Sequence, residues 1–160
     1  MALKVEIMPA GCGKKWDDQS FGQVVGIVVH HNSSCFKSLR FIYVKDNVRQ
    51  QLSKTYGEIG GKCEMIMLDY PTEFFIAVNG CYSVGDRIRC VTFVTNKATY
   101  GPFGQQRNNG SPEFSFKIAG NGPRNWISGF YGTVYDGDVE TIGVYVQTET
   151  VSQPASFKSE

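Results

Sequence analysis

The sequence lacks the features that would point to a membrane, a nucleic acid or a metal. No apolar run of about 18 residues occurs, so no segment is expected to span a membrane. Sixteen basic and 15 acidic residues nearly cancel, and no basic block stands out, which argues against a nucleic-acid partner. None of the five cysteines belongs to a CxxC pair, so zinc-ligand spacing is missing. We therefore expect neither a cofactor nor a metal.

Catalytic and helical patterns are also lacking. His30 and His31 are adjacent, but no nucleophile elbow or HExxH pattern accompanies them, so we expect ordinary histidines and no enzyme. No long segment carries an apolar stripe of helical period, and the best helical candidate, residues 46–54, is short and polar. The start, MALKVEIMPAGCG, has no apolar signal-peptide core. A cytoplasmic location is thus expected, while an extracellular one stays open.

For the cysteines and the tryptophans, the sequence allows a structural role and, as the alternative, a functional one. The five cysteines are expected to be free, mostly buried thiols; these are Cys12, Cys35, Cys63, Cys81 and Cys90. The alternative is an intermolecular disulfide through Cys12, which lies in a glycine-rich stretch. Trp16 and Trp126 are expected to pack at the end of the fold, with a sugar platform as the alternative.

Glycines, aromatic residues and alternating apolar residues are plentiful. Eighteen glycines spread along the chain indicate many tight turns. Apolar and polar residues alternate in several runs, which cover residues 39–44, 63–69, 89–95 and 142–146. A period of two indicates strands with one buried face, so the chain is predicted to be all-β.

The strands belong to an internal repeat. Glycine turns recur at nearly equal intervals, in residues 9–18, 56–65 and 100–110. A second loop and an alternating strand follow each turn, and these strands can be stacked from Ser38, Cys90 and Thr141. The second loops are residues 30–37, 79–87 and 131–140. Three four-stranded units that share a core predict a prism. The polar tail, residues 148–160, is expected to be disordered.

The third copy differs from the other two by an acidic residue. In the stacked strands, Glu140 stands against Lys37 in the first copy and Arg89 in the second. Strand geometry alone would demand the same residue type in all three, so the acid is a candidate for function. Solvated turn residues are the ordinary alternative. Calcium is a further one, although the DxDxE stretch that ends at Glu140 is shorter than an EF-hand loop.

Several strings together resemble the jacalin-related lectins. They are GCGKKWDD near the start, GGKCEMIMLDYPTEFFIAVNG in the middle, VTFVTNKATYGPFG after it, and ISGFYG followed by ETIGVYV near the end. They cover about residues 4–147 in the family's order. The resemblance implies a β-prism I fold of three four-stranded Greek-key sheets with pseudo-threefold symmetry, formed as one domain by residues 1–147. It also implies metal-free binding of mannose- or glucose-type glycans, and a homodimer or higher homo-oligomer.

The resemblance also implies where the sugar binds. The family's site combines a glycine loop near the N-terminus with a GxxxD loop before the last strand. Here these are the turn that contains Gly11 and Gly13, and the loop of residues 132–140. The candidate residues of that loop are Thr133, Tyr135, Asp136, Gly137, Asp138, Val139 and Glu140. Tyr131 is a further candidate for an aromatic rim.

Two registers of the acidic loop stay open. The family's acid stands five positions before the tyrosine of the last strand, which is Glu140 when counted from Tyr145. In that register Gly137, Asp138 and Val139 would donate backbone N–H groups. Alternatively, Gly132 to Asp136 spells GxxxD, which makes Asp136 the acceptor. We favour Glu140, because a strand fixes its entry point better than a loop fixes its length.

The other two loops are candidates for secondary carbohydrate sites. In the first copy, Lys37 and Asn32 would face Gly60 and Gly61, and the cation would favour an acidic sugar. In the second copy, Asp86 and Tyr82 would face the turn of residues 101–104. Because the acidic loop departs from the family pattern, the alternative function is a protein-interaction scaffold with altered or lost sugar binding.

Overall fold

The computed structural model describes residues 2–18, 22–45, 49–85, 87–105, 110–119 and 125–148. These residues form twelve strands: β1 (Ala2–Val5), β2 (Lys14–Asp18), β3 (Gln23–His31), β4 (Phe36–Lys45), β5 (Arg49–Gly57), β6 (Lys62–Met67), β7 (Phe75–Tyr82), β8 (Ile88–Thr95), β9 (Thr99–Gly104), β10 (Glu113–Lys117), β11 (Asn125–Tyr135) and β12 (Asp138–Thr148). No helix able to cross a membrane occurs in this described part.

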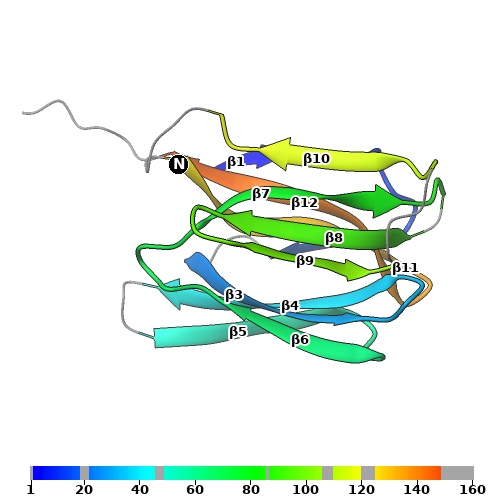
Figure 1. The fold of residues 1–160 in the computed structure, drawn as a ribbon, viewed down its shortest axis with the longest axis horizontal. Helices are drawn as coiled ribbons and strands as arrows, with labels where there is room; N and C mark the ends of the chain where they lie inside the picture. Colours follow the sequence, from blue (N-terminus) through cyan, green and yellow to red (C-terminus); the bar gives the residue numbers. More distant parts are fainter. Residues whose placement is uncertain are drawn as a thin grey trace, which may run out of the picture.

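The strands form three antiparallel units of four (Figure 1). The first has the order β5-β4-β3-β6, and the second has the order β9-β8-β7-β10. The third has the order β1-β12-β11-β2, and a single pairing, Ile127 with Phe75, joins it to the second. In each of the first two units the fourth strand lies beside the first, which is the Greek-key arrangement. The prediction of an all-β prism of Greek-key sheets is confirmed.

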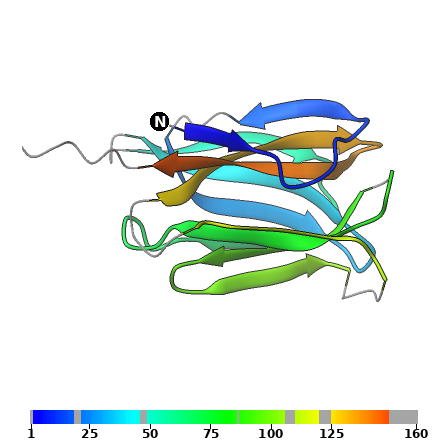
Figure 2. The same cartoon turned by 90° about the horizontal axis from the view of Figure 1, so that it is seen from above.

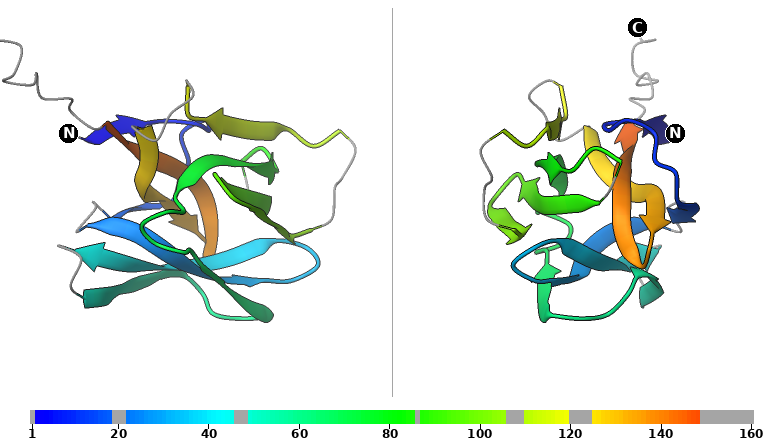
Figure 3. Two further views of the ribbon diagram at one scale, coloured as in Figure 1. Left: turned by 60° about the vertical axis from the view of Figure 1, so that its left-hand side comes forward. Right: turned by 90° about the vertical axis from the view of Figure 1, so that its right-hand side faces the viewer.

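The third unit is built from both ends of the chain. β1 pairs with β12, and β2 pairs with β11, so N-terminal strands complete the C-terminal hairpin (Figure 2). The three units surround a common axis (Figure 3). We call residues Gly11–Lys14 the Gly loop. The closure of the third unit places this loop close to the β11–β12 hairpin, although more than 120 residues separate the two in the sequence. The hydrogen bond between Gly13 and Glu140 joins them.

The core lies between the three sheets and is rich in aromatic rings. Phe41 of the first sheet stacks on Phe130 of the third, with ring centroids 5.0 Å apart. Phe75 and Phe93 of the second sheet meet Phe130 edge to face. All four rings are fully buried. Because alternate strand residues point inward, each sheet contributes rings to one core, as the period of two predicts.

The three hairpins share an unusual detail of register. Each has a β-bulge close to its tip, where one residue of the second strand is skipped in the pairing. The skipped residues are Lys37 in β4, Arg89 in β8 and Glu140 in β12. Structure and sequence repeat therefore agree on the equivalence of these positions, and the three tips lie at the same end of the prism (Figure 1).

The structure also bears on three further expectations, which concern residues 46–54, the C-terminal tail and the cysteines. Residues 49–54 of the polar stretch 46–54 belong to β5, and residues 46–48 lie outside the described residues. β12 ends at Thr148, and the rest of the tail lies outside the described residues. All five cysteines are free thiols: Cys35, Cys81 and Cys90 are buried, and Cys12 and Cys63 are exposed.

Candidate functional site

The β11–β12 hairpin closes with a two-residue turn. Tyr135 pairs with Asp138, so Asp136 and Gly137 form the tip. Both have positive φ, 51° and 87°, which is the conformation of a type I′ turn. Asp-Gly is a favoured pair in such a turn, because aspartate tolerates the left-handed region and glycine adopts it freely.

Glu140 lies at the bulge of this hairpin and faces the Gly loop. Its Oε1 accepts hydrogen bonds from the Gly13 N–H, at 2.8 Å, and from the Thr133 hydroxyl, at 2.9 Å. Its Oε2 accepts one from the Cys12 N–H, at 3.1 Å. The side chain is only 5% exposed. The carboxylate therefore pins the loop to the hairpin through charge-assisted hydrogen bonds.

The glycines of the loop are required by this close approach. A Cβ atom on Gly11 would lie 2.4 Å from the Glu140 Oε1. One on Gly13 would lie 2.2 Å from the carbonyl oxygen of Val134 and 2.9 Å from the same carboxylate oxygen. The family resemblance makes this glycine turn part of the sugar site. In the structure, the absence of a Cβ at Gly11 and Gly13 leaves room for the Glu140 carboxylate.

Asp138 points to the other side of the hairpin and is buried in an ion cluster. Lys37 Nζ lies 2.9 Å from its Oδ1, and an Arg87 guanidinium nitrogen lies 2.8 Å from its Oδ2. The hydrogen bond to Asp138 raises the pKa of Lys37. Lys37 belongs to the first sheet, Arg87 precedes the second strand of the second hairpin, and Asp138 belongs to the third sheet. The cluster thus ties all three sheets together at this end of the prism.

Asp136 and Tyr135 are the exposed members of the predicted site. Tyr135 is 48% exposed, and Asp136 is exposed at the tip. The register that makes Asp136 the acceptor also needs backbone donors from Thr133 and Val134. Both residues lie in β11, which is paired on both sides, with β2 and with β12. That backbone is therefore engaged in the sheet.

The remaining predicted residues of the third copy have structural contacts. Val139 is fully buried in the core. The Gly137 carbonyl oxygen accepts a hydrogen bond from the Glu58 N–H, at 2.7 Å, so the β5–β6 connection lies against the turn. Tyr131 lies away from the hairpin tip. Its hydroxyl donates to the Val5 carbonyl oxygen, at 2.9 Å.

The three carboxylates of the DxDxE stretch have separate surroundings. Glu140 faces the Gly loop, Asp138 faces the cations of the other sheets, and Asp136 lies at the tip. Within the described ranges, no group of three histidine, cysteine or acidic residues is arranged to hold a metal ion.

The first copy brings the expected secondary residues together, but with other partners. A Cβ on Gly60 would lie 3.0 Å from the Lys37 side chain, and one on Gly61 would lie 3.2 Å from the Asn32 side chain. The Lys37 ammonium, however, is paired with Asp138. The Asn32 Oδ1 accepts hydrogen bonds from the backbone N–H groups of Ser34 and Cys35, which stabilises its own loop.

In the second copy, Tyr82 packs against Phe114, with ring centroids 6.4 Å apart. Asp86 lies outside the described residues. Arg89, at the bulge, donates to the Ser83 hydroxyl and to the Ser34 carbonyl oxygen of the β3–β4 loop.

The sequence did not indicate that Arg87 and Glu58 would matter near this end. Arg87 and Glu58 are single charged residues in loops, and only the closure of the prism brings them to the third hairpin. A possible signal for Arg87 was the unequal distribution of charge, because a buried Asp138 needs a cation from another copy.

Comparison with known proteins shows the family to which this chain belongs. The family model described as the jacalin-like lectin domain matches residues 6–145. Jacalin-related lectin 2 of Arabidopsis thaliana is 31% identical, with 99% of this chain and 94% of the relative covered. Protein RESTRICTED TEV MOVEMENT 1 of the same plant is 32% identical, with 85% and 79% covered. The solved structure of a mannose-specific jacalin-related lectin from Morus nigra, in complex with mannose, aligns with a TM-score of 0.76 at 29% identity, over 91% of this chain and 94% of that one.

The fold is thus that of a β-prism lectin domain, a class that in general binds carbohydrate and is not enzymatic. This chain belongs to the jacalin-related lectin family.

Proposed function

We propose that this protein binds neutral glycans of the mannose/glucose type, without a metal, where the Gly loop meets the β11–β12 turn. The position of Glu140 carries the proposal. An acid occupies the third bulge only, and it is held rigidly between two segments that are distant in sequence. A preorganised acceptor of this kind suits the hydroxyl groups of a hexose, which can donate to it.

The hydrogen-bonding capacity of Glu140 leaves room for a sugar. A carboxylate can accept about four hydrogen bonds. Within the protein, Oε1 accepts two and Oε2 accepts one, so one position on Oε2 can accept from a hydroxyl. Tyr135, in the pair that flanks the turn, is exposed and offers a ring for the apolar face of the sugar.

Only a small part of the carboxylate is exposed, so a single site should bind weakly. Avidity would then come from several copies of the chain, and we propose a homodimer or larger homo-oligomer. Light scattering on a sizing column measures the mass directly, and a monomer at all concentrations would contradict this part.

The test is a glycan array followed by calorimetry with methyl α-D-mannopyranoside. We expect signals for mannose- and glucose-containing glycans, lost in Glu140→Ala and retained in Asp136→Ala. Circular dichroism must show that the variants are folded. The reverse pattern would move the acceptor to Asp136, and no signal with any glycan would overturn the proposal.

A second function is favoured by the burial of Glu140. All but one of its acceptor positions are occupied by the protein, and the turn beside it has only two residues. A β-prism whose carboxylate has only one acceptor position left for a sugar would serve instead as a protein-interaction scaffold. One relative, RESTRICTED TEV MOVEMENT 1, is named for an effect on movement and not for a sugar. A folded protein that binds no glycan on the array would favour this function.

A further inference from the structure

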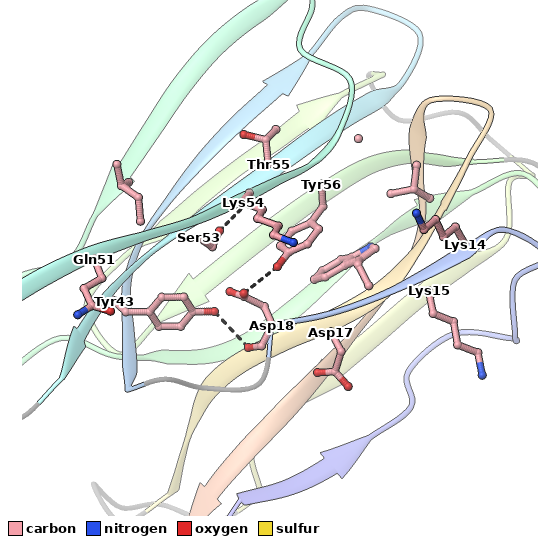
Figure 4. Close-up of a pocket in the computed structure, with 14 residues that line it drawn as sticks. Lys14, Lys15, Asp17, Asp18, Tyr43, Gln51, Ser53, Lys54, Thr55 and Tyr56 are labelled. Atoms are coloured by element: carbon pink, nitrogen blue, oxygen red, sulfur yellow. Dashed lines mark hydrogen bonds between the residues drawn. The ribbon is translucent and has the colours of Figure 1, made fainter.

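A groove runs between β2 and β5, from Lys14 and Val134 beside the β11–β12 turn to Tyr43 and Gln51 (Figure 4). Its volume is about 800 Å³, which is within the range of small-molecule sites. β2 is an edge strand of the third sheet and β5 is an edge strand of the first. The two walls therefore come from consecutive residues of two strands, 14–18 and 51–57. We call this the β2–β5 groove.

Two buried polar atoms of the groove lining have no hydrogen-bond partner among the described residues. They are the Oδ2 of Asp18, which is 4% exposed, and the indole Nε1 of Trp16, which is 7% exposed. Burial raises the pKa of Asp18 to about 6. Such unsatisfied groups cost free energy and are rare in folded proteins, so each requires an explanation.

The equivalent positions of the other sheets show that the fold does not demand this acid. Asp18 pairs with Phe130, and the corresponding pairs are Ile66 with Ile27 and Phe116 with Val78. An apolar side chain thus occupies the position in both other copies. The carboxylate is specific to the third sheet, as Glu140 is, but it lies at a different place.

Aromatic rings surround this carboxylate. The Trp16 ring stacks on Tyr56, with centroids 4.5 Å apart, and the Tyr56 hydroxyl donates to the Asp18 Oδ1 at 2.8 Å. The Tyr43 hydroxyl donates to the Asp18 carbonyl oxygen at 3.2 Å. Figure 4 shows the carboxylate between the rings of Tyr43 and Tyr56. Aromatic surface next to a free acceptor and a free donor suits a ring-shaped molecule with hydroxyl groups.

The groove carries charges of both signs, Lys14 and Lys54 on one hand and Asp18 on the other. Asp17 lies on the other face of β2, where it pairs with Lys4. An ionic ligand of either sign would therefore meet a like charge in the groove. A hydroxyl group is neutral and can donate to Asp18 and accept from Trp16.

We propose that the β2–β5 groove is a second binding site, for a neutral polyhydroxylated ring of the pyranoside class, with Asp18 as acceptor and Trp16 as donor. This site is separate from Glu140 and does not depend on binding there. It lies between two sheets, and the repeat offers no second acid at its position in the other copies.

The indole N–H of Trp16 gives a direct NMR signal for this site. The chain has two tryptophans, and the indole of Trp126 already donates to the Gln23 side chain, so it serves as an internal control. The full chain, labelled with ¹⁵N, is titrated with methyl α-D-mannopyranoside and methyl α-D-glucopyranoside. Trp126→Phe assigns the two signals. We expect the Trp16 signal to move saturably with at least one sugar while that of Trp126 stays in place.

Variants separate the groove from the Gly-loop site. In Glu140→Ala the Trp16 titration should keep its midpoint, even if the amide shifts of Gly11 and Gly13 disappear. In Asp18→Asn the midpoint should rise about tenfold or more, because a hydrogen bond to a charged acceptor is lost. Val84→Ala, which alters an exposed apolar residue outside the groove lining, should leave it unchanged.

Further arms test the ligand class and the role of the acid. Glucosamine and glucuronate should move the Trp16 signal less than the neutral sugars. A linear mannotriose shows whether the groove takes a glycan chain or a single sugar. If it takes a chain, the mannotriose should bind more tightly than the methyl glycoside. If it takes a single sugar, the two should bind equally. Asp18→Leu, the apolar choice of the other copies, should unfold at a higher temperature than the wild type and no longer respond to sugar.

Three results would overturn the proposal. These are a Trp16 signal that no neutral sugar moves, a response that vanishes in Glu140→Ala, and a response that persists unchanged in folded Asp18→Asn.

Discussion

The bulges of the first and third hairpins have the same backbone and opposite charge. Lys37 and Glu140 are both skipped in the pairing of their hairpins, close to the tip. Lys37 reaches out to Asp138 of a neighbouring sheet, whereas Glu140 reaches back to the Gly loop of its own sheet. The side chain at the first bulge thus joins two sheets, which we call the tie. The side chain at the third bulge holds the Gly loop, which we call the cradle.

The difference shows how a symmetric fold acquires a single asymmetric site. The repeat determines the position from which a side chain leaves the hairpin. The charge of that side chain then decides its partners, because a cation seeks the buried carboxylate of Asp138 and an anion seeks backbone N–H groups. At one end of the prism, one residue therefore distinguishes a bulge that joins two sheets from a bulge that is a candidate binding site.

Removal of the tie should have the largest effect on stability. Asp138→Ala leaves Lys37 and Arg87 without the carboxylate that they share, and we expect a loss of about 3 kcal/mol in the free energy of unfolding. Urea unfolding measures it. Asp69→Ala, which breaks an exposed pair with Lys97, is the control and should cost less than about 0.5 kcal/mol. Equal effects would mean that the cluster is not a tie.

Making the third bulge like the first should destroy the cradle. Glu140→Lys places a cation opposite the N–H groups of Cys12 and Gly13, which then lose their acceptor. We expect a loss of about 2 kcal/mol in stability and no glycan binding. Glu140→Gln keeps one acceptor oxygen and should lose less. Calorimetry and urea unfolding give both quantities; intact binding in the lysine variant would remove the distinction between the bulges.

Glycines of the two corresponding loops should differ in tolerance. A Cβ on Gly13 meets backbone atoms of Val134, which cannot move aside, so Gly13→Ala should cost roughly 2 kcal/mol and weaken glycan binding. A Cβ on Gly60 meets only the flexible end of Lys37, so Gly60→Ala should be nearly neutral. Thermal unfolding ranks the two variants, and a larger loss for Gly60→Ala would contradict the comparison.

The pH dependence of stability should reveal Asp18, the other acid peculiar to the third sheet. Its folded pKa of about 6 lies above the ordinary value of 3.8, so its proton stabilises the fold as the pH falls. Relative to Asp18→Asn, the wild type should gain about 1 kcal/mol between about pH 7 and about pH 5. Asp17 and Tyr56 face this group and are unchanged in both proteins. Parallel curves for the two proteins would show that Asp18 titrates normally.

The smallest effect is expected at the tip of the third hairpin. Asp136 has a left-handed backbone, which alanine tolerates less well, so Asp136→Ala should cost about 1 kcal/mol. Glycan binding should be unchanged, because the carboxylate of Asp136 is not the proposed acceptor. Asp136→Gly is the control for the backbone and should restore the lost stability; loss of binding in both variants would favour the other register.

Much of this arrangement could be predicted from residues alone. The alternating strands, the three copies and the equivalence of Lys37, Arg89 and Glu140 follow from periods that each strand carries locally. The proximity of Gly13 to Glu140 followed from the family resemblance. The partners of Asp138 could not be predicted, because an alternating pattern gives the face of a side chain but not the sheet that lies opposite.

The sequence by itself determined the strands, the threefold repeat and the one copy whose bulge holds an acid, because these depend on neighbours along the chain. Tertiary structure alone decided that Glu140 holds the Gly loop, that Asp138 is buried among cations, and that Asp18 lies unsatisfied in the β2–β5 groove. Those contacts join residues from different sheets, and only the closure of the prism by both chain ends brings them within hydrogen-bond distance.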